Sequence, residues 1–273
     1  MSSIKSCVTI SLVEQARSGP FVFHDDFEQG CVEAAKLGFD AVELFAPDSD
    51  AIAMSEVLAC TAKHGLELAA VGTGAGMVIQ GLSISDEADS RRASACDFVR
   101  SMIDYGAQAG VPAIIGSMQG EADSAEGIDT AKERLVASLM ELGSYAREKG
   151  QMLLMEPLNR YESNLCNTLA DAVALIEKSG SPNVKILADL FHMNIEEVDV
   201  AQSIRDAADY VGHVHFADSN RKAIGFGHAD IAPIAAALKE IGFSGYASAE
   251  VFAQPNSIEA AAQTKRAFDA CFG

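Results

Sequence analysis

Residues 152–157, MLLMEP, place four large apolar side chains directly before a glutamate and a proline. A continuous apolar run of this length predicts a strand that is buried on both faces, as in a parallel sheet. Glu156 stands where that strand ends. A buried carboxylate is costly unless a partner compensates its charge. The position of Glu156 therefore predicts a positively charged partner at the end of this strand.

The same arrangement, a short apolar run followed by an amphipathic stretch, recurs along the whole chain. Helical spacing of apolar residues predicts helices over residues 26–40, 129–150, 171–180 and 232–243, with the longest helix in the third unit, from about 86 to 110. The other strands are predicted at residues 8–12, 41–47, 67–74, 113–118, 184–190, 211–218 and 246–252.

Eight strand–helix units predict an α/β protein with one domain, residues 1–273, folded as a single (β/α)8 TIM barrel. The alternative is a doubly wound open sheet. It is disfavoured because no glycine fingerprint follows the first strand, and the GTGAGM segment has Met77 where the last glycine of that fingerprint would stand. Its glycines predict a tight loop at the mouth of the barrel.

The composition excludes some partners. The formal net charge is −19 and the sequence pI is about 4.6. Such a surface repels phosphate backbones and anionic lipids, which argues against nucleic-acid and membrane partners. The start of the chain lacks a long apolar segment, and the six cysteines are dispersed without a C-x-x-C pair. We therefore expect a cytoplasmic protein with reduced thiols.

Four polar residues stand at the ends of consecutive predicted strands: Glu156, Asp189, His215 and Glu250. Strand ends meet at one mouth of a barrel, so these side chains should converge. Each alone has an ordinary explanation: Glu156 could pair with Arg160, Asp189 could cap a turn, and His215 could bond a carbonyl. Four together predict a divalent metal site, and three carboxylates with one imidazole suit Mn²⁺ or Mg²⁺, with Co²⁺ also compatible.

A second set of polar residues, Glu162, His192 and Arg221, follows soon after three of these strands. We expect them in loops just above the metal site, where they could hold the hydroxyls of a polyol. The alternative is a surface ion pair, such as Arg221 with Asp218. His213 lies two residues before His215 on the same predicted strand, so both side chains should point into the barrel. His213 is expected to pack or hydrogen-bond one layer deeper than His215.

Several segments resemble the D-tagatose/D-psicose (ketose) 3-epimerase family of the xylose-isomerase-like TIM-barrel superfamily. They are EPLNRYESNLCNT (156–168), ADLFHMNIEE (188–197), HVHFADSNR (213–221), GFGHAD (225–230) and SAEV (248–251).

The resemblance implies a metal-dependent isomerase that interconverts the C3 epimers of a free keto sugar through a cis-enediolate. It implies Glu156, Asp189, His215 and Glu250 as ligands of a divalent metal, with Mn²⁺ expected ahead of Mg²⁺ or Co²⁺, and Glu156 and Glu250 as the catalytic pair. It implies Glu162, His192 and Arg221 as substrate-binding residues. We expect a small-molecule sugar substrate and a homodimer or homotetramer.

The chain departs from the family pattern in two places. Leu190 replaces the threonine of the usual D-T-F-H, and the chain has no tryptophan. Relatives often place a tryptophan beside the substrate after the fourth strand, and here Met118 or Gln119 is expected in that region.

Other reactions remain open at this point. An aldose–ketose or hydroxypyruvate-type isomerase could use the same metal site and move the proton between C1 and C2. A nuclease is disfavoured by the acidic charge and by only six histidines. A sugar-binding barrel without activity is disfavoured by the intact pair Glu156 and Glu250.

Overall fold

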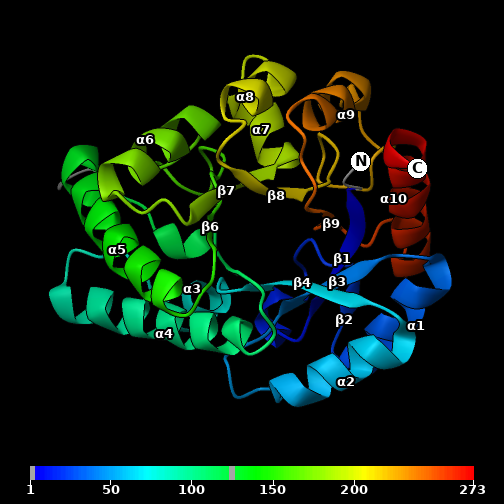
Figure 1. Ribbon diagram of the computed structural model, residues 1–273, viewed down its shortest axis with the longest axis horizontal. Coiled ribbons are helices and arrows are strands. Elements are labelled where there is room, and N and C mark those ends of the chain that lie inside the picture. The colour runs from blue at the N-terminus through cyan, green and yellow to red at the C-terminus, as the bar shows by residue number, and fades with distance from the viewer. Residues whose placement is uncertain (1–3, 123–126) are drawn as a thin grey trace.

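Eight parallel strands close into a barrel in the computed structural model, which describes residues 4–122 and 127–273 (Figure 1). Each strand pairs with the next one along the chain, and the last pairs with the first, which confirms the predicted TIM barrel. The strands are β1 (Lys5–Ser11), β3 (Ala41–Phe45), β4 (Glu67–Gly72), β5 (Ala113–Ile115), β6 (Leu153–Met155), β7 (Val184–Asp189), β8 (Val211–His215) and β9 (Tyr246–Ala249).

Two features of the strands differ from the prediction. A two-residue strand, β2 (Phe23–His24), pairs in parallel with the end of β1 and was not expected. The barrel strands also end earlier than predicted. In β6 the ladder ends at Met155, before Glu156 and Pro157, because proline has no N–H to continue it.

Ten helices are found in the described part of the chain, and they surround the barrel (Figure 1). They are α1 (Phe27–Leu37), α2 (Met54–His64), α3 (Ala75–Gln80), α4 (Asp89–Ala107), α5 (Ile128–Glu148), α6 (Leu169–Ser179), α7 (Leu190–Glu196), α8 (Val200–Asp206), α9 (Ile231–Glu240) and α10 (Ser257–Phe272). Single turns of 3-10 helix follow β1 and β5: η1 (Glu14–Ala16) and η2 (Ser117–Gln119).

One prediction about the helices is wrong. The longest helix is α5, with 21 residues, whereas α4 has 19. The helix α4 begins only at Asp89 because the Asp86 side chain accepts a hydrogen bond from the backbone of Ala88 and holds a turn there. The tight loop predicted for the glycine-rich segment is present at Thr73 and Gly74, and α3 follows it directly from Ala75.

Local sequence signals explain where α1 begins and ends. The Asp26 side chain accepts a hydrogen bond from the backbone N–H of Gln29, which satisfies one free donor of the first turn. Gly38 ends the helix with φ 81°, a left-handed conformation that glycine adopts at little cost. Between them, Phe27, Cys31 and Ala34 are buried against the barrel, as their helical spacing predicts.

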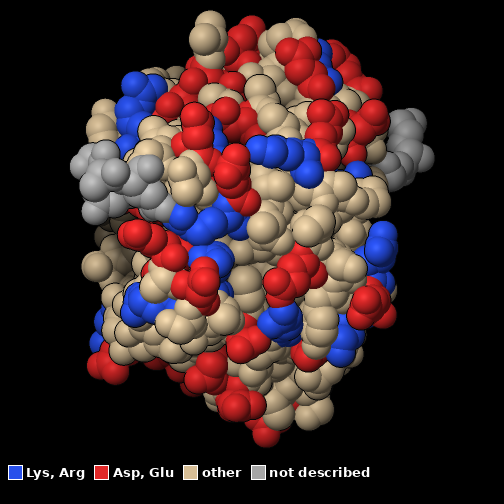
Figure 2. All heavy atoms as spheres, turned by 90° about the vertical axis from the view of Figure 1, so that its left-hand side faces the viewer, with Lys and Arg blue, Asp and Glu red and all other residues tan. Residues whose placement is uncertain are grey.

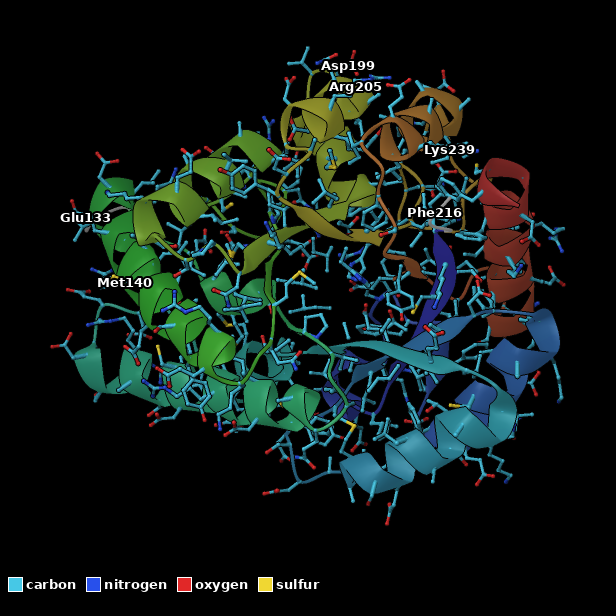
Figure 3. All side chains as sticks on the ribbon, in the orientation of Figure 1. Glu133, Met140, Asp199, Arg205, Phe216 and Lys239 are labelled. Atoms are coloured by element: carbon cyan, nitrogen blue, oxygen red, sulfur yellow. The ribbon has the colours of Figure 1, made fainter. Side chains whose placement is uncertain are left out.

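Aromatic side chains fasten the last helix to the barrel. Phe216 follows β8 and points toward α10 (Figure 3), where its ring centroid lies 6.3 Å from Phe268 and 6.0 Å from Phe272. Lys239 on α9 donates a hydrogen bond to the backbone oxygen of Cys271. Because α10 also contacts α1 and β1, the first and last parts of the chain close the ring of helices together.

The surface agrees with an acidic chain. On the face shown in Figure 2, Asp and Glu side chains are spread widely, and Lys and Arg side chains lie among them. The six cysteines are all free, and four of them are buried. Within residues 4–122 and 127–273, no helix is both long and apolar enough to cross a membrane.

Candidate metal centre

The four strand-end residues meet at one point in the barrel mouth. Asp189 and His215 are the last residues of β7 and β8, and Glu156 and Glu250 directly follow β6 and β9. One donor atom from each lies within 4.8 Å of the others. The Nδ1 atom of His215 is 2.8 Å from Glu250 Oε2, 3.3 Å from Glu156 Oε1 and 3.5 Å from Asp189 Oδ2.

Three atoms of this cluster are buried without a hydrogen-bond partner: Glu156 Oε1, Asp189 Oδ2 and His215 Nδ1. Buried polar atoms in folded proteins are rarely unsatisfied. Two carboxylate oxygens and an imidazole nitrogen that face one another satisfy their lone pairs when they share a cation. The donor set of three carboxylates and one imidazole therefore fits a divalent metal ion of the Mn²⁺ or Mg²⁺ type.

Neighbouring backbone fixes two of these carboxylates. The Oε2 atom of Glu156 lies over Gly116, where a Cβ atom would be only 2.4 Å away, so a larger residue at Gly116 would displace it. The Oδ1 atom of Asp189 accepts a hydrogen bond of 2.7 Å from the backbone of Phe191 at the start of α7. Asp189 therefore caps a helix with one oxygen and presents the other to the cluster.

The electrostatics of the cluster favour an added cation. Burial raises the pKa of Glu156, and repulsion by Glu250 and Asp189 raises it further, although His215 opposes them. Burial also raises the pKa of Asp189, but attraction by His192 and His215 outweighs it and lowers the pKa overall. Three carboxylates in a low-dielectric site thus depend on nearby positive charge.

The other nitrogen of His215 is held by a residue that the sequence analysis missed. Glu43, on β3, is 3% exposed. Its Oε1 atom lies 3.3 Å from His215 Nε2 and accepts a hydrogen bond of 3.0 Å from Thr9, and its Oε2 atom lies 2.9 Å from His213 Nε2. His213 therefore bonds one layer deeper, as predicted. The available signal was a glutamate inside the apolar strand AVELF.

The expected substrate-binding residues gather beside the cluster. Arg221 Nη1 is 3.2 Å from Glu162 Oε1, and Arg221 Nη2 is 3.3 Å from Glu250 Oε1. Glu162 and Arg221 lie in loops, as predicted. His192 lies in α7, not in a loop, and is fully buried. The seven-residue helix α7 was missed because Asp189 caps it immediately at the strand end.

The structure rules out two ordinary explanations considered for the charged residues. Arg160 pairs with Glu196, at 2.9 Å, and not with Glu156. The Asp218 carboxylate does not pair with Arg221. It accepts four backbone N–H groups instead, from Ser219, Gly225, Gly227 and Ala229.

A cavity of about 300 Å³ opens above the cluster. Its lining includes charged and polar residues of the site, Glu156, Glu162, His215, Arg221 and Glu250, and it also includes Phe21, Phe45, Gly74, Val78 and Ser117. The rings of Phe21 and Phe45 are stacked with centroids 5.0 Å apart.

Met118 and Gln119 follow the fourth barrel strand, β5, as expected, but their side chains do not line the cavity. Both side chains are fully buried away from the cavity, and Gln119 donates a hydrogen bond to the backbone oxygen of Glu156. The turn η2 directs both side chains into the protein core. Gly116 and Ser117 line the cavity in that region instead.

Comparison with known proteins gives consistent results. A family model described as xylose isomerase-like TIM barrel matches residues 31–271. A D-psicose 3-epimerase of Ruminiclostridium cellulolyticum is 34% identical over 234 residues, which cover 83% of this chain and 78% of that protein. A D-psicose 3-epimerase of Enterocloster bolteae is 43% identical over 121 residues, but that alignment covers only 44% of this chain and 40% of the relative.

Solved structures agree on the fold. The structure of an L-ribulose 3-epimerase superposes with a TM-score of 0.83 and 24% identity, and the match covers 98% of this chain and 94% of that one. The family model and the 34% identical relative both extend over most of the chain, and the family model spans all four cluster residues. This chain belongs to the xylose isomerase-like TIM barrel family, among its ketose 3-epimerases.

Proposed function

We propose that this chain is a metal-dependent ketose 3-epimerase that acts on a free keto sugar. The observation that carries the proposal is the pair Glu156 and Glu250, two carboxylates that belong to one donor cluster and line one cavity. The names of the relatives support the same reaction.

Inversion at C3 of a ketose requires removal of the proton next to the C2 carbonyl and its return to the opposite face. A divalent ion held by Glu156, Asp189, His215 and Glu250 would polarise that carbonyl and stabilise the charge of the cis-enediolate. Glu156 and Glu250 would act as the two acid/base groups, one for each face of the planar intermediate.

The charges around the cavity favour a sugar without phosphate. Among the described residues that line it, Arg221 is the only Lys or Arg, and it already contacts Glu162 and Glu250. A phosphate dianion would meet carboxylates without a free cation to compensate it. A neutral ketose could instead use Arg221, Glu162 and His192 as hydrogen-bonding groups for its hydroxyls.

We propose Mn²⁺ as the ion, with Mg²⁺ or Co²⁺ as substitutes, because the donor set is rich in carboxylate oxygens. We propose a cytoplasmic homodimer or homotetramer without nucleic-acid or membrane partners, in line with the net charge of −19. Metal analysis of the purified protein and light scattering test the ion and the assembly.

The decisive experiment follows solvent deuterium into free ketoses. The Mn²⁺-loaded protein is incubated with D-psicose or L-ribulose in D₂O, and the products are identified by NMR after the metal is removed. Deuterium at C3 together with a C3 epimer is the expected result. Deuterium at C1 with none at C3 would replace the epimerase with an aldose–ketose or hydroxypyruvate-type isomerase. Binding of the sugar without any exchange would indicate a barrel without catalytic activity.

A further inference from the structure

Asn159 lies at the centre of the proposed substrate-binding residues, although it makes no contact with the four clustered donors. We propose that Asn159 is a positioning residue that fixes the tautomer of His192, so that His192 offers an Nε2–H group to an oxygen of the sugar. The identity of that ligand rests on the proposed epimerase function. The tautomer itself does not.

The direction of the hydrogen bonds determines the tautomer. The backbone N–H of Asn159 lies 3.1 Å from His192 Nδ1. A backbone amide can only donate, so this ring nitrogen must be the acceptor. A neutral imidazole whose Nδ1 accepts a hydrogen bond carries its proton on Nε2.

The Asn159 side chain reinforces this arrangement. Its Nδ2 atom lies 2.7 Å from the same His192 Nδ1, and its Oδ1 atom accepts a hydrogen bond of 2.9 Å from the backbone of Tyr161. The bond from Tyr161 fixes which end of the amide carries the oxygen, so the NH₂ group faces the ring. Both groups of Asn159 that reach His192 are therefore donors.

The proton on Nε2 has no partner of its own within the described parts of the chain. His192 is fully buried, and its Nε2 atom lies 3.7 Å from Asp189 Oδ2, one of the clustered donors and beyond normal hydrogen-bond length. A buried N–H group without a partner, beside a candidate metal centre, points to a ligand oxygen that completes it.

The two histidines of the site thus have opposite roles. His215 bonds Glu43 through Nε2 and turns Nδ1 toward the cluster, where a lone pair can bind a cation. His192 is bonded through Nδ1 and turns an N–H group toward the same region. One imidazole serves as a metal ligand and the other as a hydrogen-bond donor.

Asn159 also connects His192 to the other residues of this set. Its Nδ2 atom lies 3.0 Å from Glu162 Oε1, and its backbone oxygen accepts a hydrogen bond of 2.9 Å from the backbone of Glu162. The same Glu162 oxygen lies 3.2 Å from Arg221 Nη1. One buried amide therefore helps to hold all three residues that would bind the sugar.

Two substitutions separate tautomer control from a purely structural role. Asn159→Asp keeps the shape, but its carboxylate accepts a hydrogen bond and draws the ring proton to Nδ1. Asn159→Ala removes the side chain and leaves the backbone donor, so the tautomer is retained. Loss of packing alone would make the alanine variant the worse enzyme. Tautomer control makes the near-isosteric aspartate variant the worse one and moves the ring proton of His192, whereas repulsion between the new carboxylate and Glu162 would leave that proton on Nε2.

The tautomer is read directly from the imidazole nitrogen resonances of the ¹⁵N-labelled, Mg²⁺-loaded protein, with His192 assigned by its loss in His192→Gln. The wild type should show a protonated Nε2 and an unprotonated Nδ1. In Asn159→Asp the proton should shift toward Nδ1.

The kcat of Asn159→Asp for D-psicose should then fall by about 100-fold, as when one donor to a developing oxyanion is removed. Metal affinity by calorimetry should stay within about twofold of the wild type, because Asn159 touches no ligand.

A matched control is Asn183→Asp. Asn183 precedes β7 at the opposite end of the barrel and donates two hydrogen bonds from its side chain, to the backbone oxygens of Gly143 and Gln151. This variant should lose stability but keep kcat.

A protonated Nδ1 on His192 in the wild type would overturn the proposal. An Asn159→Ala variant that is as impaired in kcat as Asn159→Asp would also overturn it. A correct tautomer in a wild-type protein without epimerase activity would instead reject the proposed reaction.

Discussion

Glu43 and His215 are joined across the barrel by a buried contact of 3.3 Å between Glu43 Oε1 and His215 Nε2. Burial alone would raise the pKa of Glu43, but attraction by His215 and hydrogen bonds from His213 and His215 hold it well below its usual range. Glu43 is therefore an ionised acceptor, and His215 must donate from Nε2. When Nδ1 gives its lone pair to a bound cation, the Nε2–H group is therefore still held by Glu43.

Substitution of Glu43 should accordingly weaken metal binding. Glu43→Gln nearly keeps the shape but replaces one acceptor oxygen with a donor NH₂ group, which disfavours the tautomer that a metal requires of His215. We expect Mn²⁺ affinity to fall by about 10- to 100-fold, the usual effect of losing a partner of a metal-binding histidine. Calorimetric titration of the metal-free protein measures it.

Glu133→Gln is the matched control, because Glu133 is exposed on the outer face of α5, far from the barrel mouth (Figure 3). Its Mn²⁺ affinity should equal that of the wild type. Equal affinities in Glu43→Gln and the wild type would show that Glu43 does not set the tautomer of His215.

Removal of the metal should destabilise the fold as well as abolish activity. The ion would compensate three carboxylates whose repulsion otherwise opposes folding. A ligand that binds only the folded state stabilises it by about 2.7 kcal/mol at 100 times its Kd. Chelation should lower the melting temperature, and Mn²⁺ or Co²⁺ should restore both stability and turnover. An unchanged melting temperature and full activity in a sample with no measurable metal would contradict the proposed centre.

Asp218 should control substrate binding through the loop that carries Arg221. Its carboxylate accepts four backbone N–H groups, and its backbone oxygen accepts the N–H of Arg221, which has φ 57°. Asp218→Asn places an NH₂ group among these donors and should loosen the loop. We expect a raised KM and a lower melting temperature with unchanged Mn²⁺ affinity.

The pH dependence of stability provides a separate test of Asp218. Burial would raise its pKa, but the four backbone donors lower it overall. A group with a lowered folded-state pKa contributes stability above its unfolded pKa of about 3.9, and this contribution disappears as the pH falls through the folded value. The stability difference between the wild type and Asp218→Asn should therefore be largest near neutral pH and shrink in acid. A difference that is constant from neutral pH into acid would contradict this role.

The sequence predicts the barrel and the cluster because both depend on a regular pattern. Apolar runs recur once per strand–helix unit, and polar residues at their ends must meet at one mouth when the sheet closes. Glu156, Asp189, His215 and Glu250 could be grouped in this way without knowledge of any contact.

Contacts across the barrel do not follow from that pattern. Glu43 lies 172 residues from His215 along the chain, and only the closed barrel brings them together. The inward direction of Met118 and Gln119 depends on the single turn η2, which has no periodic signal. The sequence gives no sign that Asn159 differs from other loop asparagines, because its contact with His192 depends on where α7 lies in the fold. Such residues act through tertiary geometry, which local spacing does not encode.

The roles of Glu156 and Glu250 can be separated by isotope exchange. If they serve opposite faces of an enediolate, each should remove the C3 hydrogen of only one epimer. Glu156→Gln and Glu250→Gln should each lose full epimerisation. Each variant should still exchange deuterium from solvent into C3 of the one epimer that its surviving glutamate faces, and the two variants should prefer opposite epimers. NMR of each purified epimer in D₂O measures the exchange.

The two variants should also differ in how they bind the sugar, because Glu250 contacts Arg221 at 3.3 Å whereas Glu156 is packed over Gly116. Glu250→Gln should therefore weaken the binding of both epimers, measured by calorimetry, whereas Glu156→Gln should leave binding nearly unchanged. Both residues belong to the donor cluster, so exchange is compared only at Mn²⁺ concentrations that saturate each variant, as verified by metal analysis. Exchange of the same epimer in both variants would mean that one face, and one base, carries the proton transfer. In that case the second carboxylate would serve the metal alone, and a two-base inversion at C3 would be rejected.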